Sequence, residues 1–87
     1  MSLSDEVRQV VLEILAIDLD EHLPEDHTLL KQYGMDSVAM IRLAVAVEKR
    51  FGVKFKGRDL LERNFASIGD MVNLLLDKQQ RATKVPE

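Results

Sequence analysis

Cysteine is absent from this 87-residue chain, so it can form no disulfide, no thiolate zinc site and no cysteine nucleophile. Tryptophan is also absent, and one Tyr and three Phe leave few rings on which nucleic-acid bases could stack. No apolar run is long enough to span a bilayer, and no secretory apolar segment follows Met1. We therefore expect a cytoplasmic protein, a monomer without nucleic-acid or membrane partners.

Positive charge is scarce in residues 1–30, which contain one cationic and eight acidic side chains. Residues 31–66 reverse this balance with eight cationic and four acidic side chains, although the whole chain has a net charge of −3. This separation of acidic and basic residues along the chain is informative about the choice of partners more than about the fold. The acidic residues lack the spacing and the glycine of a calcium-binding loop, so we expect a solvated loop and no metal site.

Helical periodicity dominates the remaining pattern, and 46% hydrophobic residues suffice for one small core. The apolar spacing predicts four helices, over residues 4–17, 37–51, 58–63 and 67–78. A long connection, residues 18–35, separates the first two helices. The predicted fold is all-α, a small four-helix bundle of three main helices and one short helix. We expect one domain over residues 1–80 and a flexible tail over residues 81–87.

The helix boundaries have recognisable signals. Ser4 is a good cap for the first helix, and Gly52 supplies the stop after the second. Ser67 followed three residues later by Asp70 is typical of a capping box that opens the last helix. The inward residues expected outside the second helix are Leu3, Val7, Val10, Val11, Ile14, Leu15, Leu23, Leu29, Leu30, Tyr33, Val53, Phe55, Leu60, Leu61, Phe65, Ile68, Met71, Val72, Leu75 and Leu76.

The second helix has two distinct faces when its residues are placed at about 100° intervals. Its core face comprises Met40, Leu43, Ala44, Val47 and Phe51. On the opposite side, Val38 and Val45 alternate with Arg42 and Lys49 along one outward stripe. Two aliphatic and two cationic side chains in this order indicate a docking surface for a protein partner, although single exposed valines are common and need no function.

The start of this helix carries the most informative motif, Gly34-Met35-Asp36-Ser37-Val38. Asp36 and Ser37 are both good N-cap residues, and Gly34 permits a tight turn into the helix. The helix dipole and the unpaired amides at this end favour a phosphate. Ser37 is therefore a candidate for carrying a phosphodiester.

This motif resembles the prosthetic-group site of the acyl and peptidyl carrier proteins of fatty-acid, polyketide and nonribosomal-peptide synthesis. Their signature is Gly-x-Asp-Ser followed by an aliphatic residue, and the resemblance extends over residues 3–80, including the run from Phe65 to Val72. In that family the serine accepts 4'-phosphopantetheine from coenzyme A, and the thiol of this arm carries the cargo as a thioester. The missing thiol of the chain itself is compatible with such a role.

The resemblance implies a role for several residues and partners. Ser37 would be the attachment site of 4'-phosphopantetheine, and Asp36 would help to position the phosphopantetheinyl transferase and its divalent metal. Further partners would be a ligase or acyltransferase that loads the cargo and synthase enzymes that use it. The chain would itself be a non-catalytic carrier of an acyl or aminoacyl group.

The sequence departs from the family pattern at one place that bears on the pathway. Carriers of bacterial fatty-acid synthesis tend to be strongly acidic along the second helix, whereas this stripe contains Arg42 and Lys49. This favours a discrete carrier of a specialised pathway, such as polyketide or nonribosomal-peptide synthesis, over a fatty-acid carrier, which stays an alternative. The other alternative is a helical interaction module without a prosthetic group. His22 and His27 lie in the polar connection, where no spacing relates them to a hydrolytic serine.

Overall fold

Three α-helices make up most of the fold: α1 (Leu3–Ile14), α2 (Ser37–Phe51) and α3 (Ile68–Lys84). Three short 3-10 turns lie in the connections: η1 (Leu30–Tyr33), η2 (Gly57–Asp59) and η3 (Glu62–Asn64). The computed structural model describes residues 2–18, 20 and 22–84, the last five of these by their backbone. No strand occurs among these residues, so the predicted small all-α bundle is confirmed. In the same part of the chain, no helix is long and apolar enough to cross a membrane.

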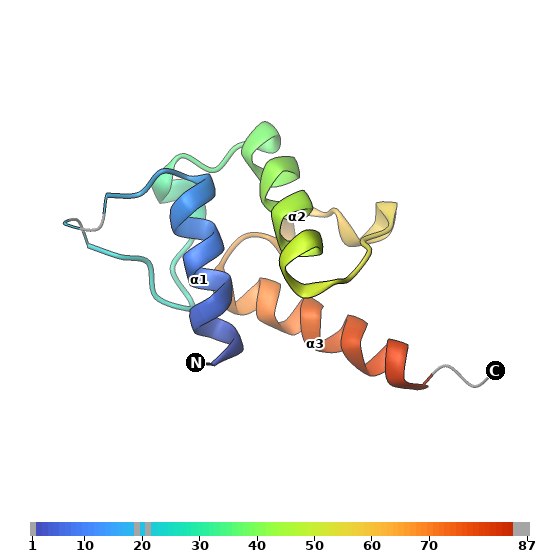
Figure 1. The fold of residues 1–87 in the computed structure, drawn as a ribbon. Coiled ribbons are helices and arrows are strands. Elements are labelled where there is room, and N and C mark those ends of the chain that lie inside the picture. The colour runs from blue at the N-terminus through green and yellow to red at the C-terminus, as the bar shows by residue number, and fades with distance from the viewer. Residues whose placement is uncertain (1, 19, 21, 85–87) are drawn as a thin grey trace.

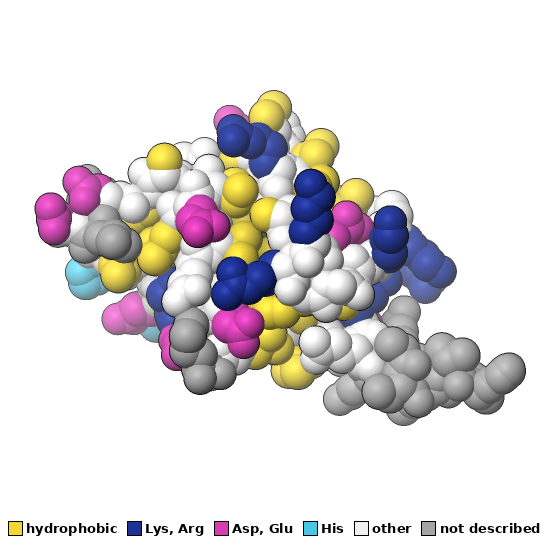
Figure 2. Space-filling model, viewed as in Figure 1, with side chains coloured by type: hydrophobic (Ala, Val, Ile, Leu, Met, Phe, Trp, Pro, Cys, Tyr) yellow, Lys and Arg dark blue, Asp and Glu magenta, His cyan; other side chains and the backbone are white. Residues whose placement is uncertain are grey.

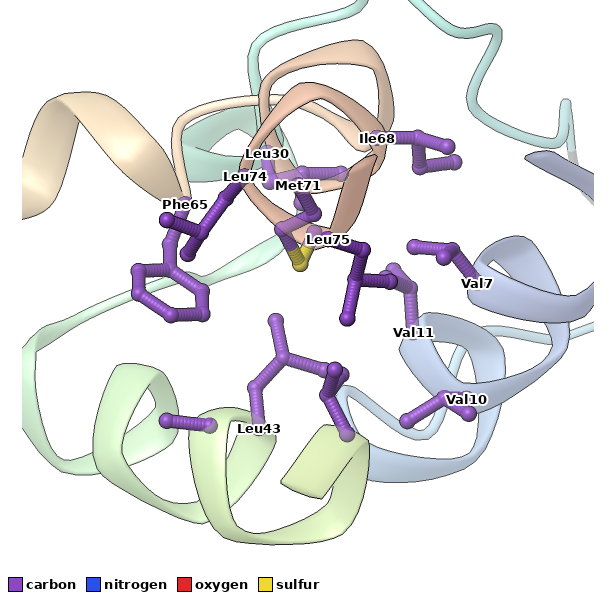
Figure 3. Packing of buried hydrophobic residues seen from close by; sticks show 12 residues of the cluster. Val7, Val10, Val11, Leu30, Leu43, Phe65, Ile68, Met71, Leu74 and Leu75 are labelled. Carbon is purple, nitrogen blue, oxygen red and sulfur yellow. The ribbon is translucent and has the colours of Figure 1, made fainter. Parts of the chain in front are cut away.

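The helices pack so that α1 contacts both α2 and α3. Figure 1 shows α3 starting beside the N-terminal half of α1 and running beneath α2, with its C-terminal turns extending beyond both. The core lies where the three helices meet, and Figure 3 shows its side chains pointing toward one another from all three. The fully buried members of this core include Val7, Val11, Leu30, Leu43, Val47, Phe65, Ile68, Met71 and Leu75. Because every helix contributes to one apolar cluster, the cluster sets the position of α2.

The cap of the first helix lies two residues earlier than the sequence predicts. Ser2 caps α1 by accepting a hydrogen bond from the Asp5 backbone N–H at 3.1 Å. The predicted cap, Ser4, instead donates its hydroxyl to the Asp26 carboxylate at 2.6 Å. The earlier start adds Leu3 to the helix, where its side chain packs against the core. The prediction of the cap was wrong because two good capping residues compete, and the packing of Leu3 favours the first.

The first helix also ends before residue 17. Ala16 has a φ of 53°, in the left-handed region, and the Ile17 backbone N–H reaches back to the Leu12 carbonyl at 3.0 Å. This pattern is a Schellman motif, which usually has glycine at its left-handed position. The motif directs the chain away from the helix and into the long connection. No glycine announces this helix end in the sequence, so periodicity alone placed it too late.

The long connection is fixed to the bundle at a few points. Leu30 and Pro24 are buried, Leu23 and Tyr33 are half-buried, and the predicted anchor Leu29 is exposed. The Arg8 guanidinium donates to the Pro24 carbonyl at 3.1 Å and pairs with the Asp26 carboxylate. The connection therefore depends on polar contacts with α1 as well as on apolar anchors.

The predicted short helix over residues 58–63 is wrong in detail. The structure has two 3-10 turns there, η2 and η3, separated by Leu60 and Leu61. Leu60 packs against the core, whereas Leu61, expected to point inward, is exposed. A segment this short does not gain enough hydrogen bonds to propagate an α-helix, so side-chain contacts of Asp59 decide its shape.

The last helix is longer than predicted. Its capping residues Ser67 and Asp70 are correct, because the Asp70 backbone N–H donates to the Ser67 hydroxyl at 3.2 Å. The helix continues to Lys84 although the sequence predicts a loss of periodicity from residue 79, and residues 85–87 of the predicted tail lie outside the described residues. Leu76, expected to be buried, is exposed, and Leu74 is buried in its place.

Candidate functional site

A tight turn delivers the chain to the N-terminus of α2. Gly34 ends η1 with a φ of 90°, a left-handed conformation that side chains other than glycine rarely adopt. The turn is held in place by Leu30, whose side chain is buried and whose backbone N–H donates to the Ala66 carbonyl at 2.8 Å. This turn was predicted from Gly34, and it fixes where residues 35–37 lie.

Asp36 is the N-cap of α2. Its backbone is extended, and its carboxylate oxygen Oδ1 accepts a hydrogen bond from the Ala39 N–H at 2.8 Å. Its carbonyl accepts the first intrahelical bond, from the Met40 N–H, also at 2.8 Å. The sequence left open whether Asp36 or Ser37 caps this helix, and the structure assigns the cap to Asp36. A carboxylate here also interacts favourably with the positive end of the helix dipole.

Ser37 is consequently the first residue inside α2, and its side chain is exposed. Among the described residues, its hydroxyl forms no hydrogen bond, so neither the cap nor the core uses it. The first N–H groups of a helix have no intrahelical acceptors, and they favour an anion beside them. The hydroxyl is therefore accessible to a large reagent at a place where a phosphate group would be stabilised.

A cavity of about 410 Å³ opens beside Ser37. One side is formed by the end of the long connection and the start of α2, and the other by residues of and after η3. Its lining residues are Leu29, Lys31, Met35, Asp36, Ser37, Met40, Glu62, Arg63, Phe65 and Ala66. The mixture of apolar walls and charged rim residues would suit a flexible ligand that has both apolar and polar parts.

The outward stripe of α2 is exposed as predicted. Val38 and Val45 have exposed fractions of 65% and 43%, and Arg42 and Lys49 are also exposed. Sequence reasoning missed Ile41, which is 55% exposed and belongs to the same stripe. Its helical position lies about 60° from Val38, so a wider arc on the helical wheel would have found it.

A buried ion pair joins the segment just before η3 to α3, outside the lining of the cavity. The Asp59 carboxylate lies 2.6 Å from Lys78 Nζ and also accepts the Lys56 backbone N–H at 2.7 Å. Burial by itself would raise the pKa of Asp59, but the Lys78 and Lys56 hydrogen bonds and the positive charges of Lys78 and Arg58 lower it overall. This pair ties η2 to α3 and thereby holds the segment that forms the far side of the cavity.

The two histidines considered as candidates in the sequence do not belong to this site. The His27 imidazole lies 3.4 Å from the Glu25 carboxylate, and the His22 carbonyl accepts the Tyr33 hydroxyl. Among the described residues neither histidine contacts Ser37, so this part of the chain contains no hydrolase-like constellation at the α2 N-terminus. Within the described part of the chain, no three His, Asp or Glu side chains are close enough together to hold a metal ion.

Comparison with known proteins agrees with the geometry. The family described as "Phosphopantetheine attachment site" matches residues 5–75. The acyl carrier protein of Sulfurovum sp. is 31% identical over 86% of this chain and 96% of its own length, and that of Campylobacter curvus is 32% identical over 86% and 94%. The acyl carrier protein of Helicobacter pylori strain G27 is 29% identical over 91% of this chain and 97% of its own length. No solved structure matches significantly. The chain therefore belongs to the acyl carrier protein family, whose members are non-catalytic carriers with covalently attached 4'-phosphopantetheine.

Proposed function

We propose that this chain is a discrete carrier that holds an acyl or aminoacyl group as a thioester on 4'-phosphopantetheine attached to Ser37. The observation that carries the proposal is the division of roles at the α2 N-terminus. Asp36 caps the helix, and the Ser37 hydroxyl is exposed and without a hydrogen bond among the described residues. The relatives support the carrier role, because the three named above are acyl carrier proteins and this chain spans 94–97% of their length.

The chemistry assigned to Ser37 is a single displacement at phosphorus. The hydroxyl oxygen bonds to the pantetheine-side phosphorus of coenzyme A, the bond from that phosphorus to the adenosine half breaks, and the hydroxyl proton passes to the transferase. The helix N-terminus favours the phosphodiester that results. The attached group supplies a terminal thiol that forms the thioester. Asp36 keeps the helix start rigid during the reaction and presents its exposed carboxylate to the transferase and its divalent metal.

The surroundings of Ser37 fit such a group. The cavity beside the hydroxyl has apolar walls from Met35, Met40 and Phe65, against which the chain of the arm can lie. Lys31 and Arg63 lie at the same cavity and can face the phosphate or the polar amides of the arm. These residues would shield the arm between successive encounters with enzymes.

Partner enzymes dock on the outward stripe of α2 in this proposal. Val38 and Val45 supply apolar contact, and Arg42 and Lys49 select the partner by charge. The partners are a phosphopantetheinyl transferase, a ligase or acyltransferase that loads the cargo, and downstream synthase enzymes. The cationic stripe supports a specialised pathway of the polyketide or nonribosomal-peptide type. The apolar cavity beside Ser37 favours the second candidate, a carrier of fatty-acid synthesis.

The attachment is tested by incubating the apo protein with coenzyme A and a broad-specificity phosphopantetheinyl transferase, followed by intact-mass measurement. We expect a gain equal to one phosphopantetheine group, which the S37A variant does not show. S2A is the matched control, because Ser2 is also an exposed serine at a helix N-terminus and should not affect the gain. An unmodified wild-type chain, or a modified S37A chain, would refute the assignment.

The pathway requires a separate measurement. The mass of the group bound through the thioester, determined on protein isolated from its native cells, distinguishes the two candidates. A short amino acid or a branched or substituted acid supports the specialised pathway, and a series of straight-chain acyl groups of increasing length supports fatty-acid synthesis.

A further inference from the structure

The outward face of α2 is short, apolar and positively charged. We define the α2 outer face as Val38, Ile41, Arg42, Val45 and Lys49, which fall within an arc of about 100° and a length of about 16 Å. Three of the five are aliphatic side chains exposed by 65%, 55% and 43%. The face begins one residue after Ser37, so anything that docks on it also lies beside the Ser37 hydroxyl.

The positive charge of this face is not neutralised within the described structure. The described ion pairs of residues 31–66 involve Arg50 and Asp59, and neither Arg42 nor Lys49 takes part in one. Glu48 is the sole acidic residue of α2, and its carboxylate accepts the Phe55 backbone N–H at 2.6 Å. The α2 outer face therefore combines exposed aliphatic side chains with two cations and no acidic group.

The charge distribution of the whole molecule strengthens this polarity. Figure 2 shows acidic side chains at the edge formed by the long connection and basic side chains gathered over α2 and the segment that follows it. A molecule with separated charges is oriented by the field of an approaching partner, and the attraction is strongest within about 8 Å at physiological salt. A negatively charged partner would therefore meet the chain with the α2 outer face, and Ser37, in front.

We propose that the α2 outer face docks enzymes whose docking surface is an apolar depression rimmed by Asp and Glu side chains, so that this carrier selects acidic partners. This proposal rests on the function assigned to Ser37 above, and it names the chemistry of the partner. Val38, Ile41 and Val45 form the apolar part of the contact, and Arg42 and Lys49 pair with the acidic rim. Apolar contact at the centre and charge at the rim is the usual division of roles at protein interfaces.

Two other occupants fit the face less well. A stable second copy buries about 800 Å² on each chain, which is more than five side chains of one helix provide. A lipid surface favours large apolar side chains such as Trp, Phe and Leu, whereas this face has Val and Ile, and the opposite face of α2 is buried in the core. A brief contact with an enzyme needs neither a large area nor insertion.

The test uses one broad-specificity phosphopantetheinyl transferase in two versions, with the residues around its carrier-docking surface changed to Glu in one and to Lys in the other. We expect the Glu version to modify the wild-type chain with a kcat/KM about tenfold higher than the Lys version, and the preference to weaken as salt is raised. The R42E/K49E variant should reverse the order of the two versions. The K54E/K56E variant changes charge equally outside the face and should retain the wild-type order.

The apolar part is tested by I41A, which should lower kcat/KM about threefold to tenfold with either transferase version. L76A is its matched control, because Leu76 is an aliphatic residue exposed on α3. Thermal melting establishes that all variants are folded.

Several outcomes would overturn the docking proposal. These are equal rates with both transferase versions, an unchanged order in R42E/K49E, or binding of the wild-type chain to phosphatidylglycerol vesicles that the same reversal abolishes. If neither version modifies the wild-type chain while both modify a control acyl carrier protein, the assignment of Ser37 fails, and the docking proposal fails with it.

Discussion

The N-termini of α2 and α3 use the same two residue types in opposite roles. At α3 the serine is the cap: Ser67 is buried, accepts the Asp70 N–H and donates its hydroxyl to the Asp70 carboxylate at 2.9 Å. At α2 the aspartate is the cap, and Ser37 is exposed without a hydrogen bond among the described residues. A serine at a helix start is thus available for chemistry only where another residue performs the capping.

The same contrast applies to the carboxylates. Asp36 is exposed and bonded to one N–H group, whereas Asp59 is buried, paired with Lys78 and bonded to a backbone N–H. The polar groups between η2 and the start of α3 thus stabilise the fold, whereas those at the start of α2 face solvent. Variants at these two places can therefore separate effects on stability from effects on modification.

The largest effect on stability is expected for D59N, which removes the counter-charge of the nearly buried Lys78. We expect a loss of about 3 kcal/mol in the free energy of unfolding, measured by urea denaturation with circular dichroism. The folded-state pKa of Asp59 lies below its ordinary value of 3.8. The stabilisation that the Asp59 carboxylate provides is therefore complete above pH 3.8 and is lost as the pH falls through the folded-state pKa. D59N should therefore lose less stability than the wild type in this acidic range; an identical pH dependence would contradict the assignment.

S67A should lower the free energy of unfolding by about 1–2 kcal/mol, since it removes a buried cap and leaves the Asp70 N–H without its acceptor. The same variant should still accept one phosphopantetheine group at its own Ser37. Loss of modification in a folded S67A chain would mean that the two helix starts are not independent.

D36A should lower the free energy of unfolding by about 1 kcal/mol because α2 loses its cap, whereas D36N keeps a capping oxygen and should lose less than half of that. If the charge of Asp36 serves the transferase, D36N should still be modified much more slowly than the wild type, in a coupled rate assay with saturating coenzyme A. Modification at the wild-type rate would leave Asp36 a purely structural role.

The smallest effect is expected for S37A, which should change the free energy of unfolding by less than about 0.5 kcal/mol while abolishing modification. The alanine removes a hydroxyl without a described partner and is well tolerated inside a helix. A loss comparable to that of S67A would show that the hydroxyl of Ser37 has a structural partner, and the comparison would no longer hold.

Much of the bundle was predictable because its signals are local. The limits of α2 follow from the capping residue Asp36 and the left-handed Gly52, whose φ is 67°. The two faces of α2 follow from its helical period, and Ser67 with Asp70 marks the start of α3. By contrast, the early end of α1 depends on a left-handed Ala16, which has no sequence signal.

The candidate site was predictable in its residues but not in its arrangement. Sequence alone placed Asp36 and Ser37 at one helix start, and the family resemblance indicated the attached group. The cavity beside Ser37 and the burial of Asp59 against Lys78 involve segments far apart in the chain. No local pattern describes such contacts.

The sequence by itself determined the helical class, the limits of α2 and the identity of the family, because capping, periodicity and a short motif act between near neighbours. Only the tertiary structure decided that the Ser37 hydroxyl is exposed without a hydrogen bond to any described residue, and that Leu29 and Leu61 face solvent. The physical reason is that burial depends on how three helices and their connections pack together, and that packing is a property of the whole chain.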